Sequence, residues 1–155
     1  MAPPSTQITQ PHRSIRFSPW ERIGLLSLGF VLSTLLALAS WLTPDPMGLG
    51  THRQLGLPGC TLYTILGIRC PGCGMTTSWA HTLNGDIANG LDCNIAGVLL
   101  CFLTVGLVPC LFGLAILGEP SRQSWVFRVS IFLLIAILSI SIFEWLIRLA
   151  FTSAV

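Results

Sequence analysis

The chain has few charged residues and no lysine, and both shortages exclude whole classes of protein. Only 9% of its 155 residues are charged, against about 25% in an ordinary soluble domain. Soluble globular proteins and disordered chains both need more polar residues than this composition supplies. All eight basic residues are arginines, and they form no cluster. The chain therefore lacks the basic patch that binds nucleic-acid phosphates, and we expect no nucleic acid among its partners.

Several enzyme motifs are absent from the sequence as well. It has no glycine-rich phosphate loop, no zincin motif and no arrangement of residues that suggests a catalytic triad. These absences favour a protein that is not an enzyme, although they leave thiol chemistry open.

Apolar residues, in contrast, make up 52% of the chain, and the mean hydropathy is +0.76. Three segments are apolar over 20 residues or more, which is the length that a helix needs to cross a bilayer. They are residues 23–42, 95–117 and 129–151. The sequence thus predicts an all-α integral membrane protein with three transmembrane helices, and the lipid bilayer as its first partner.

The segments between the predicted spans differ in length and character. Residues 1–22 are polar and proline-rich and predict a flexible tail, and residues 118–128 predict a short loop. Residues 43–94 form the only long polar segment and contain four cysteines, so we name them the Cys loop. Within this loop the pattern predicts two short helices, over residues 75–83 and 87–91.

The first predicted span has an alternative interpretation as a signal peptide. Ala37-Leu38-Ala39 matches the small-residue pattern that signal peptidase cleaves, and a basic region and an apolar run precede it. The long region before the apolar run, and the continuation of that run past the site, favour a retained helix.

The second span carries two rows of small residues, which lie on opposite faces of a helix at 100° per residue. Small residues let helices approach closely in lipid. We therefore predict that this helix lies between two neighbours. The rows are Gly97, Cys101 and Thr104 on one face and Gly106, Cys110 and Gly113 on the other.

Arginines predict the orientation, because cytoplasmic segments of membrane proteins carry an excess of them. Five arginines lie before the first span or between the second and third, and three lie in the Cys loop or at the end of the chain. This majority predicts a cytoplasmic N-terminus and an external Cys loop. The two sets are Arg13, Arg16, Arg22, Arg122 and Arg128, against Arg53, Arg69 and Arg148.

Candidate chemistry is concentrated in the Cys loop. Cys70-Pro71-Gly72-Cys73-Gly74 predicts a tight turn with both sulfurs on one side, similar to the knuckle of zinc ribbons, and we call this turn the knuckle. A structural zinc needs four donors. We predict that the sulfur of Cys60 converges with those of Cys70 and Cys73, and that Cys93 or His81 is the candidate fourth ligand of a zinc site.

Two other interpretations of the knuckle stay open at the level of sequence. Cys70 and Cys73 could form a redox pair, because a Cys-x-x-Cys before a helix favours a reactive thiolate. Cys60 and Cys93 could then form a second pair in an external loop. Alternatively, the knuckle could be purely structural and serve assembly with another membrane protein.

The stretch from Cys60 through the Cys70–Thr76 segment, with Gly85-Asp86 and Asn94 after it, resembles the domain-of-unknown-function 2752 family of small bacterial membrane proteins. The resemblance implies a multi-pass protein of the bacterial inner membrane and implies no reaction. Two positions depart from the family pattern. Thr77 stands where the family usually has arginine, and Ile95 stands where it tends to have proline.

Overall fold

The computed structural model describes residues 17–117 and 120–152, and every regular element in those two ranges is a helix. Three of the helices are long: α1 (Pro19–Trp41), α5 (Ile95–Leu117) and α6 (Pro120–Thr152). Between α1 and α5 lie four short ones: η1 (Thr51–Leu55), α2 (Thr61–Leu66), α3 (Met75–Leu83) and α4 (Ile87–Cys93). The three long helices are apolar enough to cross a membrane, over Pro19–Trp41, Ile95–Leu117 and Ser124–Ala150. The predicted fold class is therefore confirmed.

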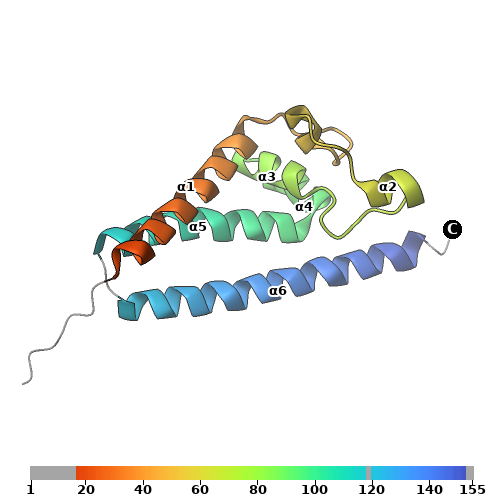
Figure 1. Ribbon diagram of the computed structural model, residues 1–155. Helices are drawn as coiled ribbons and strands as arrows, with labels where there is room; N and C mark the ends of the chain where they lie inside the picture. The colour runs from red at the N-terminus through yellow and green to blue at the C-terminus, as the bar shows by residue number, and fades with distance from the viewer. Residues whose placement is uncertain (1–16, 118–119, 153–155) are drawn as a thin grey trace, which may run out of the picture.

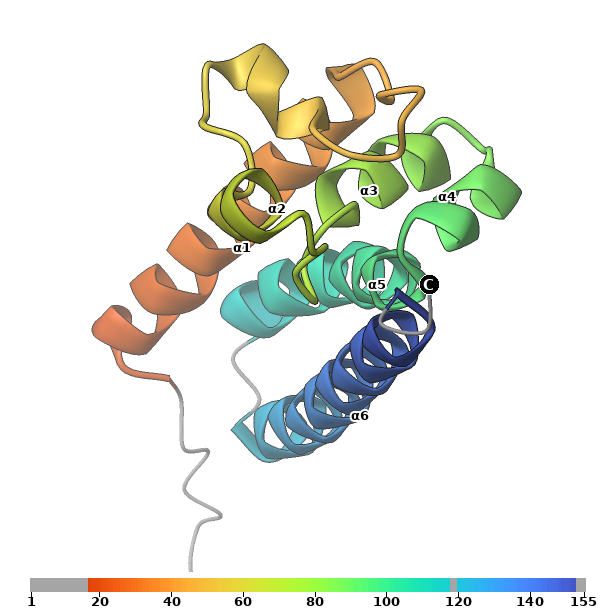
Figure 2. The ribbon, with the colours of Figure 1, turned by 90° about the vertical axis from the view of Figure 1, so that its right-hand side faces the viewer.

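Helix α5 lies at the centre of the arrangement, as its small residues predicted. It packs against α1 on one side and α6 on the other, while α3 and α4 cover its N-terminal end (Figures 1 and 2). The contact with α1 is close because Gly29 faces the ring of Phe112, 3.1 Å from where a Cβ would stand. Phe30 and Phe112 then meet edge to face, with ring centroids 5.3 Å apart.

Two loop predictions differ from the structure. Of the predicted tail, residues 1–16 lie outside the described residues, but residues 19–22 already belong to α1. The helix begins early because Pro19 suits a first helical turn and Glu21 accepts a hydrogen bond from the Ser18 amide at 2.8 Å. In the predicted loop 118–128, residues 118 and 119 lie outside the described residues, and the rest is helical.

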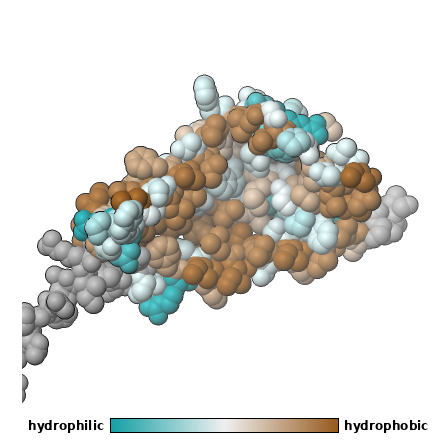
Figure 3. Space-filling model, in the orientation of Figure 1, coloured by the Kyte–Doolittle hydropathy of each residue, from teal (hydrophilic) through white to brown (hydrophobic). Residues whose placement is uncertain are grey.

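The outer faces of α1 and α6 are covered by large apolar side chains (Figure 3). Phe30 is 64% exposed and Phe132 is 72% exposed. Apolar area of this extent is unfavourable in water but favourable against lipid chains. The surface therefore agrees with helices embedded in a bilayer, and the chain is a membrane protein.

Only one of the two predicted small-residue rows of α5 is a packing surface. Cys101 and Thr104 are buried, and Gly97 lies directly against Ser78 of α3. On the other face, neither Gly106 nor Gly113 has a neighbouring atom within 4 Å of an added Cβ in the described part of the chain. The prediction of a second packed seam was therefore wrong. An apolar groove of about 240 Å³ remains there, lined among others by Phe102 and Trp125.

This difference between the two faces predicts opposite effects for the same substitution. In Gly97→Ala the new Cβ would overlap the Ser78 hydroxyl and lie 3.3 Å from the Met75 Cα. We expect a destabilisation of about 2 kcal/mol. Gly106→Ala meets open space, so helix propensity should stabilise it by up to about 1 kcal/mol. Thermal unfolding in detergent measures both, and equal melting temperatures would contradict the packing described here.

Candidate metal centre

The knuckle is a backbone-bonded turn that presents two sulfurs together. The amide of Cys73 donates to the carbonyl of Cys70 at 3.0 Å, and the amide of Met75 donates to Gly72 at 3.2 Å. The two Sγ atoms are 3.1 Å apart, and the Cys70 amide donates to the Cys73 Sγ at 3.2 Å. Backbone amides that point at sulfur favour the negative charge of a thiolate.

Gly74 fixes where the knuckle sits. Its φ of +85° lies in the left-handed region, which suits glycine. An added Cβ would lie 2.7 Å from the carbonyl oxygen of Cys93 and 3.0 Å from that of Gly48. The knuckle is thereby held against the end of α4 on one side and against the first part of the Cys loop on the other.

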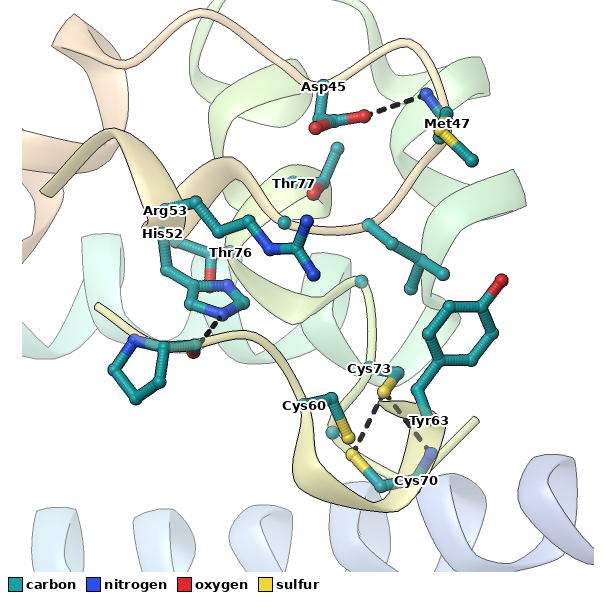
Figure 4. Close-up of a pocket in the computed structure, with 15 residues that line it drawn as sticks. Asp45, Met47, His52, Arg53, Cys60, Tyr63, Cys70, Cys73, Thr76 and Thr77 are labelled. Atoms are coloured by element: carbon teal, nitrogen blue, oxygen red, sulfur yellow. Dashed lines mark hydrogen bonds between the residues drawn. The ribbon is translucent and has the colours of Figure 1, made fainter. Parts of the chain in front are cut away.

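A short helix brings the third thiol to the knuckle. Cys60 directly precedes α2, and Gly67 ends this helix with a φ of +68°, so the chain turns back toward the knuckle. The sulfurs of Cys60, Cys70 and Cys73 lie within 4.8 Å of one another, and we call them the thiol cluster (Figure 4). A tetrahedral zinc with Zn–S bonds of about 2.3 Å holds its sulfurs roughly 3.8 Å apart. The cluster already has nearly this spacing.

The two residues considered as a fourth ligand lie elsewhere. Cys93 is buried at the end of α4, with its sulfur against Gly48, and this burial raises the pKa of its thiol. His81 places its Nδ1 3.1 Å from the Oδ2 of Asp86, which caps α4. Among the described residues, the group of convergent donors consists of the three cysteines alone.

Asn94 connects the knuckle to the first turn of α5. Its Nδ2 donates to the carbonyls of Pro71 and Cys73, both at 3.2 Å, and its Oδ1 accepts from the Gly97 amide at 2.7 Å. The residue is only 1% exposed. Sequence analysis noted Asn94 only as part of a resemblance. Its position just before an uncharged helix is a typical N-cap and could have indicated this role.

Helix α6 also hydrogen-bonds to this turn and to the residue before it. The Ser141 hydroxyl donates to the Pro71 carbonyl at 3.2 Å, and the Trp145 indole donates to the Arg69 carbonyl at 2.8 Å. One turn further along, Arg148 forms an ion pair with Glu144 and donates to the Cys93 carbonyl at 3.4 Å. The turn that carries Cys70 and Cys73 is thus hydrogen-bonded both to the residue that precedes α5 and to α6.

A cavity of about 360 Å³ opens onto all three cysteines (Figure 4). Its polar lining includes Asp45, His52 and Arg53, none of which was predicted from the sequence to belong to the site. They belong to η1 and the chain before it, and only the folded Cys loop brings them to the knuckle. The buried hydrogen bond between the hydroxyls of Thr51 and Thr77, 2.8 Å long, attaches η1 to α3.

The pKa values of the Cys60 and Cys73 thiols are shifted in opposite directions. Hydrogen bonds from the Tyr63 backbone and from Cys73 lower the pKa of Cys60 to about 7. Burial, together with hydrogen bonds to Cys70 and Cys60, raises the pKa of Cys73 to about 12. Cys60 therefore ionises at a lower pH than Cys73.

These shifts predict a pH profile for alkylation of the metal-free protein. Because only the thiolate reacts, the rate of iodoacetamide modification at Cys60 should rise with pH through a midpoint near 7 and level off above about pH 8. Modification of Cys73 should remain slow and keep increasing beyond pH 9. Peptide mass spectrometry follows both sites in one sample. A midpoint for Cys60 at the ordinary thiol value would contradict the hydrogen bonding described above.

Comparison with known protein families gives a match over part of the chain. Residues 60–108 match the model of a family described as a protein of unknown function (DUF2752). The matched segment contains the whole thiol cluster, α3, α4 and the first half of α5. This match confirms the resemblance found in the sequence. No curated protein and no solved structure matches the chain.

Proposed function

We propose that this membrane protein, whose residues 60–108 match the DUF2752 family, binds a thiophilic metal ion through Cys60, Cys70 and Cys73. Zinc is the first candidate, because thiolates bind it strongly and it accepts sulfur donors in tetrahedral geometry. The observation that carries the proposal is the convergence of three sulfurs within 4.8 Å.

The way the cluster is built supports this proposal. Two donors come from one hydrogen-bonded turn, and the third, Cys60, precedes the separate helix α2 and lies ten residues before Cys70. A bound ion would tie α2 to the knuckle, a connection that no disulfide makes in the structure, where all three thiols are free. We infer a structural role that stabilises the Cys loop for contact with another membrane protein, with no catalysed reaction.

The direct test is the metal content of the full-length chain purified in detergent under reducing conditions. We expect one zinc or cadmium ion per chain after dialysis against metal at micromolar concentration. Cys110→Ser provides a matched control, because Cys110 is exposed on α5 and lies outside the thiol cluster. A reduced wild-type chain that keeps no metal would refute the proposal.

The 3.1 Å separation of the Cys70 and Cys73 sulfurs also favours a second function, thiol–disulfide exchange. The two thiols would reduce a substrate disulfide to two thiols and form the Cys70–Cys73 disulfide, so that electrons and protons balance. A glutathione redox buffer separates the two functions. A chain that binds no metal but forms this disulfide reversibly would favour the oxidoreductase.

We also propose that the protein lies in the bacterial inner membrane with its N-terminus in the cytoplasm and the Cys loop outside. The arginine distribution supports this orientation. The close packing of Gly29 on Phe112 supports a first helix that is retained rather than cleaved. After mild reduction, a membrane-impermeant maleimide should label Cys60 in intact cells. Labelling only after permeabilisation would show that the orientation is the opposite of the one proposed.

A further inference from the structure

We infer that the fourth coordination position of the bound metal is filled by a small thiol that carries a carboxylate, which enters through the cavity beside η1 and is held by Arg53. The inference rests on the proposed metal function and assigns a ligand class to the same site.

The thiol cluster supplies fewer donors than a tetrahedral metal ion takes. Zinc and cadmium with thiolate ligands take four donors, and a site with three protein ligands keeps one position open for an exogenous group. Among the described residues, only three donors converge. Cys93 and His81 lie against other partners. The described residues therefore leave one position vacant in any tetrahedral complex formed here.

The open coordination position faces the cavity beside η1. Cys60, Cys70 and Cys73 all line the cavity of about 360 Å³, so a metal at their centre has its unprotected side toward this space. Ligand pockets range from about 300 to 1,000 Å³. The cavity is at the lower end of this range, which suits a small molecule better than a protein side chain from a partner.

Charged side chains in the cavity wall determine which ligand the cavity suits. His52 is engaged with the Pro58 carbonyl at 3.1 Å, and Asp45 accepts from the Met47 amide at 2.8 Å. The Arg53 guanidinium has no hydrogen bond or ion pair within residues 17–117 and 120–152, although it lies in the cavity (Figure 4). Such a guanidinium is well suited to bind a carboxylate through two parallel hydrogen bonds.

The location of Arg53 sets the size of the ligand. A Cβ added at Gly59 would collide with the guanidinium, so this group touches the residue directly before Cys60. A molecule with only a few atoms between its sulfur and its carboxylate can therefore reach from the metal to Arg53. Its thiol would lose a proton to the buffer as the metal–sulfur bond forms and a water molecule leaves. The positive charge of Arg53 offsets the negative charge of the ligand's carboxylate.

The test uses the cadmium-loaded full-length chain in detergent and three probes: mercaptoacetate, 2-mercaptoethanol and acetate. Cadmium NMR and sulfur-to-cadmium charge-transfer absorbance report a fourth sulfur ligand. We expect mercaptoacetate to bind once per chain and roughly tenfold or more tightly than 2-mercaptoethanol, because only the former has a carboxylate for Arg53. Acetate alone should leave the cadmium signal almost unchanged.

Arg53→Gln should remove the preference for mercaptoacetate, whereas Arg69→Gln, at an arginine of the same loop that lines a different cavity, should retain it. Equal binding of the two thiols to the wild-type chain would overturn the inference without any variant. So would a cadmium signal that neither thiol changes. Both results would leave the metal function intact, whereas a chain that binds no cadmium would remove the metal function and the inference together.

Discussion

Replacing Cys70 by serine is expected to weaken metal binding by more than about 100-fold. The substitution exchanges a soft thiolate for a hydroxyl, which stays protonated and binds zinc poorly, while the volume and the backbone of the turn are nearly unchanged. Residues that merely support a metal ligand already contribute 10- to 100-fold in affinity, so loss of a ligand should exceed that range. Competition with a chromophoric chelator, carried out on the full-length chain in detergent, measures the change.

Two further serine variants complete this experiment. Cys110→Ser should bind metal like the wild type, because Cys110 is exposed on α5. Cys93→Ser should also retain metal, because the Cys93 sulfur packs against Gly48 rather than the thiol cluster. A loss in Cys93→Ser as large as that in Cys70→Ser would show that α4 rearranges to supply a fourth ligand. Full retention in Cys70→Ser would refute the metal site.

The second large effect is expected at Asn94, where we predict that leucine destabilises the protein by about 3–5 kcal/mol. Leucine has a similar volume but makes no hydrogen bond, so the Cys73 carbonyl and the Gly97 amide lose their Asn94 partner. The Pro71 carbonyl keeps only the bond from Ser141. Each buried polar group left without a partner costs about 1–3 kcal/mol. Thermal or denaturant unfolding in detergent measures the loss.

Asn89→Leu is the matched control, because Asn89 is an exposed asparagine of α4 whose side chain bonds only Asp86 in the described structure. We expect it to cost less than about 1 kcal/mol. Asn94→Asp should keep the cap of Gly97 but place a carboxylate against two carbonyl oxygens, so metal affinity should fall even where the fold survives. Similar stability of Asn94→Leu and Asn89→Leu would contradict the role assigned to Asn94.

The fold class could be predicted from sequence because membrane helices carry a strong one-dimensional signal. Uninterrupted apolar runs indicate spans without knowledge of any contact. The helix starts were harder. The early start of α1 depends on the bond from Ser18 to Glu21, a local signal that was present but not used. Helix α6 begins before the predicted position and includes Arg128. The side chain of Arg128 donates to the Ser124 carbonyl one turn back.

Packing detail could not be predicted in the same way. Two rows of small residues on α5 are equivalent by spacing, yet within the described residues Gly97 is the one glycine of these rows that lies directly against another helix. Which row is used depends on where α3 and α6 lie, and this follows from long-range contacts. At Gly106 a small residue does not mark a helix contact, because a small residue permits close approach without supplying a neighbouring helix.

The candidate site was predictable only in part for the same reason. The knuckle is local, so the side-by-side position of Cys70 and Cys73 follows from five consecutive residues. Cys60 was expected to join them because glycines interrupt the apolar stretch between it and the knuckle, and the structure places it there. Arg53 gave no signal, because it approaches the thiols only after η1 is attached to α3 through Thr51.

The bonds from Ser141 and Trp145 to the carbonyls of Pro71 and Arg69 make the occupancy of the thiol cluster and the packing of α6 thermodynamically linked. A ligand that binds only the ordered knuckle stabilises the helix bundle by an amount that grows with the logarithm of its concentration. Linkage is reciprocal. If a bound metal ion favours one position of α6 along its axis, a bilayer thickness that favours the same position must raise the affinity of the cluster for the metal. The lipid environment would then act as an effector of metal binding at the knuckle.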